Sequence, residues 1–225
     1  LTASLVAQTK QYDGSDAAVL SNASYVLNGF VTVNNVTQGA SVTKTAGLYN
    51  SANVSGATTV STTLATSDFT ANSGTNLNNY ILPTVASTAV GSGTITAKTL
   101  TASLTAQTKV YDQSDAAVLT NASYVLSGFV TVGGVTQGAS VTQTAGTYVD
   151  SSGVATKNVL NATKVVASLA TSDFTANSGT DLSNYSLPTV ASTAAGSGTI
   201  SAKALSVTGL SVADKTYDGT TTATL

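Results

Sequence analysis

The chain repeats itself, and this repetition constrains its fold more than any other feature. Residues 1–49 match residues 100–148 at 40 of 49 positions, and residues 64–98 match residues 169–203 at 30 of 35 positions. Residues 205–225 resemble the opening of both copies but are more diverged. Units of this size are large enough to bury a core. The sequence therefore predicts two tandem modules, 1–99 and 100–204, followed by the first strand of a partial third repeat, 205–225.

Each copy begins with alternating apolar and polar residues, a pattern typical of a half-buried strand. In residues 1–12, Leu1 and Leu5 would lie on one face, with Lys10 and Tyr12 on the opposite, polar face. The third copy has one extra residue beside Gly209, which predicts a β-bulge. Further strands are expected at 25–33, 40–49, 57–66, 80–82 and 94–98, with equivalents in the second copy.

Regularly spaced short strands predict an all-β fold of tandem Ig-like β-sandwich modules, with a β-grasp-like module as the alternative. Residues 16–20 fit either a single helical turn capped by Ser15 or a short strand. The stretch that joins the two modules contains no Gly or Pro between Gly93 and Tyr111. We therefore expect the last strand of one module to continue into the first strand of the next, joining the modules end to end.

The composition excludes several classes of function. The sequence contains no Cys, His, Met, Trp, Arg or Glu, and its formal net charge is -2. Nucleic-acid binding needs clusters of basic residues, so no nucleic-acid partner is expected. No apolar run approaches the ~20 residues that cross a bilayer, so no membrane insertion is expected in this segment. Ser and Thr supply 70 of 225 residues (29 Ser plus 41 Thr), which suits an extracellular surface, and the chain is not expected to be an enzyme.

A Lys-x-Tyr-Asp signature recurs in all three copies. Its residues are Lys10, Tyr12 and Asp13, then Lys109, Tyr111 and Asp112, then Lys215, Tyr217 and Asp218. The aspartate is expected to end the opening strand and to cap the following turn with its own side chain. Because Gln113 replaces the glycine that follows Asp13 and Asp218, an obligatory left-handed glycine is not expected. The signature is interpreted as structural, with no catalytic residue and no cofactor.

Two chemical alternatives for the signature remain open. Asp13 and Asp16, with Asp112 and Asp115 in the second copy, are calcium candidates, although they supply fewer than the six to eight oxygens that calcium prefers. The signature lysines could form isopeptide bonds, with Asp68 and Asp173 as the candidate acids. The alternation instead predicts ordinary exposed lysines.

A second recurring element is "NYILP" at 79–83 and "NYSLP" at 184–188. It places Tyr80 and Tyr185 next to a proline that would end a strand. We expect core tyrosines with an anchored hydroxyl, and an exposed carbohydrate platform is the alternative.

These motifs carry a family resemblance. Residues 205–225, "LSVTGLSVADKTYDGTTTATL", resemble the opening of the YDG-type repeat of large bacterial exoproteins of the filamentous-haemagglutinin-like class. The "NYxLP" element followed by "GSGTITAK" or "GSGTISAK" resembles the close of that repeat. The resemblance implies a secreted, surface-attached adhesin, often exported by two-partner secretion in Gram-negative bacteria, whose tandem repeats act as stalk modules. It implies no catalytic residues.

The sequence and the resemblance together predict a spacer segment of a long cell-surface or biofilm adhesin, located outside the cell. Its expected partners are neighbouring repeats of the same polypeptide, with copies of itself or matrix glycans as further candidates. One alternative is a filament subunit that donates its unpaired strand 205–225 to another copy. Another is a multivalent repeat that binds glycans or proteins weakly.

Overall fold

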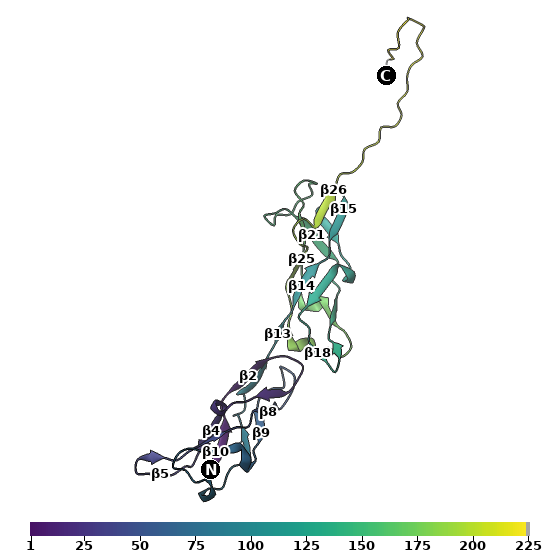
Figure 1. Cartoon of the computed structure of the whole chain (residues 1–225). Helices are drawn as coiled ribbons and strands as arrows, with labels where there is room; N and C mark the ends of the chain where they lie inside the picture. Colours follow the sequence, from purple (N-terminus) through teal and green to yellow (C-terminus); the bar gives the residue numbers. More distant parts are fainter. Residues whose placement is uncertain (224–225) are drawn as a thin grey trace.

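The computed structural model describes residues 1–223, which form strands, turns and 3-10 turns of three residues (Figure 1). The predicted all-β class is confirmed, and the arrangement is of the sandwich type. None of the described residues forms a helix with the length and hydrophobicity that crossing a membrane requires. In Figure 1 the two repeats lie end to end, and the third copy extends away from the second as a single chain.

Repeat 1 is built from one antiparallel sheet and several two-stranded pairs. The sheet has the order β11-β9-β8-β3, and the pairs are β1-β4, β7-β10 and β5-β6, all antiparallel, and β2-β12, which is parallel. The strands are β1 (Thr2–Leu5), β2 (Gln8–Gln11), β3 (Ala17–Val19), β4 (Tyr25–Asn28), β5 (Thr32–Val33), β6 (Val36–Thr37), β7 (Ala40–Val42), β8 (Ala46–Tyr49), β9 (Val60–Thr63), β10 (Phe69–Ala71), β11 (Val85–Ser87) and β12 (Gly93–Thr96).

Repeat 2 forms the same arrangement, with the sheet order β16-β21-β22-β25. Its pairs are β14-β17, β20-β23, β18-β19 and the parallel β15-β26. The strands are β14 (Thr101–Leu104), β15 (Gln107–Val110), β16 (Ala116–Val118), β17 (Tyr124–Ser127), β18 (Thr131–Val132), β19 (Val135–Thr136), β20 (Ala139–Val141), β21 (Ala145–Val149), β22 (Lys164–Ser168), β23 (Phe174–Ala176), β24 (Tyr185–Ser186), β25 (Val190–Ser192) and β26 (Gly198–Ser201).

The core of each repeat joins the sheet to the shorter pairs. In repeat 1 it contains Val60 from the sheet, Val42 and Phe69 from β7-β10, and Ile95 from β12. Val60 and its equivalent Val165 are fully buried. Alternate residues of β8, β9 and β12 are buried, so burial of apolar surface, the main stabilising term, fixes which face these strands present to the core.

The helical turns lie elsewhere than expected. Residues 16–20 contain strand β3, so the short-strand interpretation is correct and the helical one is wrong. The 3-10 turns are η1 (Asn22–Ser24), η2 (Thr66–Asp68) and η3 (Leu77–Asn79), with η4 (Asn121–Ser123), η5 (Thr171–Asp173) and η6 (Leu182–Asn184) in repeat 2. The predicted strand at 80–82 is not formed in repeat 1, whereas its counterpart β24 is formed in repeat 2.

The opening strand is not continuous, which reverses the expected orientation of its second half. Residues Val6 and Ala7 separate β1 from β2, and the two strands pair with different partners, β4 and β12. Leu5 is buried before this break, and Tyr12 is buried after it, at 5% and 4% exposure. The prediction that Lys10 and Tyr12 lie on the polar face is therefore wrong, because the two-residue break shifts the alternation by one position.

The chain that joins the repeats is extended, but it forms three short strands with different partners where one continuous strand was expected. Strand β12 is followed after one residue by β13 (Lys98–Thr99), and β13 is followed after one residue by β14. Strand β13 pairs with β24, so the connecting chain is itself part of repeat 2's strand pairing. Figure 1 shows β13 between the two repeats.

The third copy does not form the expected strand within residues 205–223. In repeats 1 and 2 the opening strands pair with strands that come later in the same repeat. Gly209 has a left-handed φ of 78°, but with no ladder there is no bulge. Residues 224 and 225 lie outside the described residues.

Candidate functional site

The signature forms the same local structure in all three copies. The Lys10 Nζ donates to Asp13 Oδ1 at 2.7 Å and to the carbonyl oxygen of Ser15 at 2.8 Å. The Asp13 Oδ1 also accepts from the Ser15 amide at 2.9 Å, so the predicted capping by the aspartate is confirmed. Equivalent bonds join Lys109, Asp112 and Ser114 in repeat 2, and Lys215, Asp218 and Thr220 in the third copy.

These bonds are local, because the third copy keeps them without any paired strand around it. Tyr217 is 93% exposed there, whereas Tyr12 is 4% exposed. The signature therefore closes its own turn, and the surrounding repeat then buries the tyrosine. In the folded repeats the lysine also lies over a core tyrosine ring, 5.5 Å from the Tyr49 centroid for Lys10 and 5.3 Å from the Tyr148 centroid for Lys109.

The residue after the aspartate is left-handed in every copy. The φ angles are 81° at Gly14, 67° at Gln113 and 73° at Gly219. The expectation drawn from Gln113 is therefore half wrong. Glycine is not obligatory, but all three copies share the left-handed conformation because the aspartate side chain fixes the turn through its bond to the amide two residues later.

The structure does not gather the calcium candidates into a site. Among residues 1–223, no three acidic side chains lie close enough to hold a metal ion. The Asp13 and Asp112 carboxylates are each paired with a lysine ammonium, at 2.7 and 2.8 Å, which would repel a cation. Asp16 and Asp115 make no side-chain hydrogen bond within the described residues.

The contacts of the candidate acids do not support the isopeptide alternative either. The acids proposed for it, Asp68 and Asp173, accept from the amides of Ala65 and Ala170 at 2.8 Å and so cap their own 3-10 turns. The Lys10 side chain is only 18% exposed, so the prediction of an ordinary exposed lysine is wrong. It is held by Asp13 and Ser15 instead.

Tyr12 of the signature takes part in the main contact between the repeats. Its ring meets the Tyr185 ring edge to face, with 5.3 Å between centroids. Its hydroxyl donates to Gln137 Oε1 at 3.3 Å, and the Tyr185 hydroxyl is bonded to the same oxygen. The Tyr185 hydroxyl also accepts from the Val130 amide at 3.2 Å. Burial raises the pKa of Tyr185, so its hydroxyl stays protonated and able to donate.

A second contact between the repeats uses an asparagine. Asn184 is completely buried, and its Oδ1 accepts from the Val54 amide of repeat 1 at 2.8 Å. Its Nδ2 donates to Asn53 Oδ1 at 3.0 Å. A buried amide with both ends paired in this way fixes the orientation of one repeat on the other.

The connecting chain completes the junction. Leu100 is 2% exposed and belongs to the apolar cluster of repeat 1, together with Val130 and Tyr185 of repeat 2. Its amide donates to the Ser186 carbonyl at 3.0 Å. The junction therefore combines an apolar centre, a tyrosine-glutamine network, a buried asparagine and a strand pair.

The same residues are exposed where a repeat has no neighbour. Val31, the equivalent of Val130, is 53% exposed against 6%. Tyr80 repeats the contacts of Tyr185, bonding Gln38 Oε1, accepting from the Val31 amide at 3.3 Å and packing against Phe30. At the other end of the chain, Tyr111, Asn158, Val159 and Leu205 contribute to the lining of a cavity of about 550 Å³.

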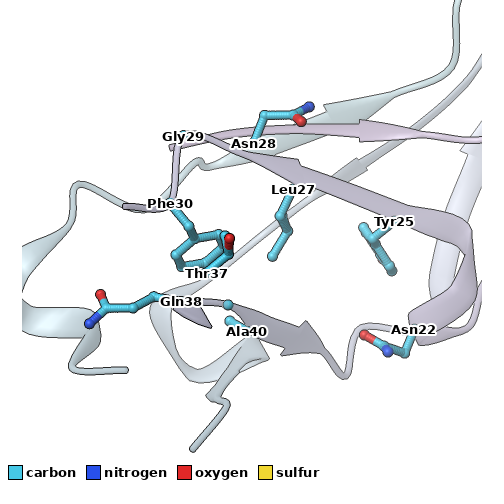
Figure 2. Close-up of a pocket in the computed structure, with 10 residues that line it drawn as sticks. Asn22, Tyr25, Leu27, Asn28, Gly29, Phe30, Thr37, Gln38 and Ala40 are labelled. Carbon is cyan, nitrogen blue, oxygen red and sulfur yellow. The ribbon is translucent and has the colours of Figure 1, made fainter. Parts of the chain in front are cut away.

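A groove also recurs in both repeats, and Figure 2 shows Tyr25, Leu27 and Phe30 pointing into it in repeat 1. Its volume is about 410 Å³ in repeat 1 and about 540 Å³ in repeat 2. Two of its polar groups are already paired, because the Tyr25 hydroxyl donates to the Lys44 carbonyl and Asn22 Oδ1 accepts from the Val42 amide. The groove is therefore a weaker candidate than the junction.

Sequence reasoning identified part of this junction and missed the rest. It predicted a core tyrosine with an anchored hydroxyl, which is confirmed for Tyr185. It missed Gln137, Asn184 and Asn53. Their identity in both repeats gave no signal, because the repeats are alike at nearly every position. Comparisons with family models, curated proteins and solved structures found no match.

The signature aspartates make the fold sensitive to acid. Hydrogen bonds from Lys109 and from the Ser114 amide hold the pKa of Asp112 below its ordinary value of 3.8. At Asp13, burial raises the pKa, but bonds from Lys10 and Ser15 together lower it below 3.8. A carboxylate with a lowered folded pKa stabilises the fold fully above its unfolded pKa, and this contribution is lost as the pH falls through the folded value.

We therefore expect the free energy of unfolding to fall with pH below 3.8, measured by urea titration at a series of pH values. Replacing both residues (Asp13→Asn with Asp112→Asn) should flatten this dependence, because asparagine keeps an acceptor for the turn but carries no titrating group. The matched control is Asp16→Asn with Asp115→Asn, which should keep the native slope. Equal slopes in the two double variants would contradict the assignment.

Proposed function

We propose that this chain is a load-bearing spacer made of β repeats stacked end to end, and that it belongs to the stalk of a bacterial cell-surface adhesin. The observation that carries the spacer role is the junction, where Leu100 and Asn184 are buried between repeats. Buried apolar and amide contacts hold two units in one orientation, whereas a flexible linker would leave these side chains in water. The role is mechanical and assigns no catalysis.

The adhesin context rests on separate support. The resemblance to YDG-type repeats and the hydroxyl-rich composition both favour a secreted surface protein. The proposed partners are neighbouring repeats of the same polypeptide. A multivalent glycan-binding role has less support, because the Tyr25 hydroxyl and Asn22 Oδ1 of the recurring groove are already bonded within the protein.

Single-molecule stretching of the chain, held at its two termini, tests the mechanical role. We expect two unfolding events of nearly equal contour length, since repeats 1 and 2 fold the same way, each preceded by measurable resistance. The residues of the third copy should extend first without a force peak, because they pair with no strand within 205–223. Extension of the whole chain without resistance would contradict the proposal.

A further inference from the structure

One residue of the signature lies directly in the junction. A Cβ placed on Gly14 would lie 2.4 Å from Val132 Cγ2 and 3.5 Å from Val130 Cγ2 of repeat 2. Carbon atoms in contact normally lie about 3.5–4.0 Å apart. The absence of a side chain at Gly14 therefore allows the two repeats to approach each other.

Repeat 2 carries Gln113 at the equivalent position, with the same left-handed backbone and the same turn. The replacement leaves in place the bonds of Lys109 to Asp112 and to the Ser114 carbonyl, and the bond of the Ser114 amide to Asp112. The replacement instead changes the end of repeat 2 that faces away from repeat 1, where Gln113 and Tyr111 line the open cavity beside Val159. A further repeat with the shape of repeat 2 could therefore not dock on this end in the way that repeat 2 docks on repeat 1.

At the opposite end of the chain, repeat 1 has the same surface that repeat 2 presents to repeat 1. We define the N-terminal face of a repeat as Val130, Val132, Gln137, Asn184 and Tyr185 in repeat 2, and Val31, Val33, Gln38, Asn79 and Tyr80 in repeat 1. In repeat 1 this face has the same bonds and ring packing as in repeat 2. The Leu1 amine donates to the Ile81 carbonyl as the Leu100 amide donates to the Ser186 carbonyl. Val33 of repeat 1 is 50% exposed, whereas its equivalent in repeat 2, Val132, lies beside Gly14.

We propose that the N-terminal face of repeat 1 docks the end of another repeat of this type, and that it selects a repeat with glycine after Tyr-Asp. Gln113 then prevents copies of this chain from joining head to tail, because the glutamine side chain meets Val33 of the next copy. The inference rests on the proposed spacer function and names the partner of its exposed face. Its physical basis is steric exclusion at one position, with the other contacts unchanged.

The first test introduces the glutamine into the internal junction of the intact chain (Gly14→Gln). Hydrogen exchange of the Val130 amide is the readout, because this amide is buried at the junction, whereas the equivalent Val31 amide makes the same bond at an exposed position. We expect protection to fall at least tenfold, while amides in the core of repeat 1 keep theirs. Gly14→Gln with Val132→Ala should restore protection, and Val132→Ala alone should change it little. Native protection in Gly14→Gln would overturn the proposal.

The second test removes the Gln113 side chain, which would otherwise block docking at the far end of repeat 2 (Gln113→Gly). Nuclear magnetic resonance spectra recorded up to about 1 mM detect association in the millimolar range. The Val31 amide and the Tyr80 ring should shift with concentration in Gln113→Gly but not in the native chain. Adding Val33→Asp should abolish the shifts. Concentration-independent spectra of Gln113→Gly, or shifts of equal size in the native chain, would overturn the docking surface.

These outcomes are separable from failure of the proposed function. A native junction that is already flexible contradicts the spacer role. A rigid native junction that tolerates Gly14→Gln leaves the spacer role intact and contradicts only the selection by glycine.

Discussion

Replacing Gly93 by alanine is expected to unfold repeat 1 under conditions in which the native repeat is stable. A Cβ at this position would lie 2.3 Å from the Thr59 carbonyl carbon and 2.5 Å from the Val60 nitrogen. Both atoms belong to the backbone, so neither can rotate away as a side chain can. The cost should reach about 3 kcal/mol, the upper part of the range for overpacked cores. Thermal and urea unfolding would measure it.

The neighbouring glycine of the same "GSG" element gives a matched control. Gly91 has a left-handed φ of 84°, and a Cβ there would meet nothing within 4 Å. Gly91→Ala should therefore cost only the strain of a left-handed alanine, about 1–2 kcal/mol. Gly198→Ala should repeat the large effect in repeat 2, where the nearest backbone atom is 2.2 Å away. Equal losses in Gly91→Ala and Gly93→Ala would show that close packing is not the reason for the glycine.

Truncating Leu100 to alanine is expected to have the second large effect. This side chain is 2% exposed in the centre of the junction, so its removal leaves a cavity between the repeats. Loss of a buried leucine side chain costs about 2–5 kcal/mol. The loss should appear as separate unfolding of the two repeats in a urea titration followed by residue-specific probes, because the junction couples them.

The control for this truncation is built into the chain. Leu1 occupies the same position in repeat 1 but is only partly buried. Leu1→Ala should therefore cost clearly less than Leu100→Ala and should leave the coupling of the repeats unchanged. A larger effect of Leu1→Ala would mean that the leucine stabilises its own repeat and that the junction contributes little.

The fold class and the course of the chain through the junction were predictable from the sequence. Both follow from local patterns: short strands separated by turn residues, and an unbroken run of strand-forming residues after Gly93. The turn of the signature was predictable for the same reason, because the Asp13 side chain bonds the amide two residues later. The third copy shows that this turn needs no tertiary contact.

The orientation of Lys10 and Tyr12 was not predictable by alternation. Alternation assumes a continuous strand, and the break at Val6 and Ala7 shifts the inward face by one position. Neither residue is a Gly or a Pro, so nothing in the sequence marks the break. It arises because β1 and β2 pair with strands in different parts of the repeat.

The junction contacts were not predictable because their burial comes from the neighbouring repeat. Asn79 and Asn184 occupy equivalent positions and are each followed by a tyrosine, yet only Asn184 is buried, since only repeat 2 has a preceding repeat in the structure. One sequence difference at the junction is Gly14 against Gln113. Its meaning becomes visible only when Val132 is found beside Gly14.

Residual dipolar couplings of the native chain test the central claim, that the junction holds the two repeats as one rigid unit. Amide couplings from the core strands of repeats 1 and 2 would be measured in one alignment medium. We expect a single alignment tensor to fit both repeats in the relative orientation shown in Figure 1. Two tensors of different magnitude would show independent motion of the repeats and would contradict the account.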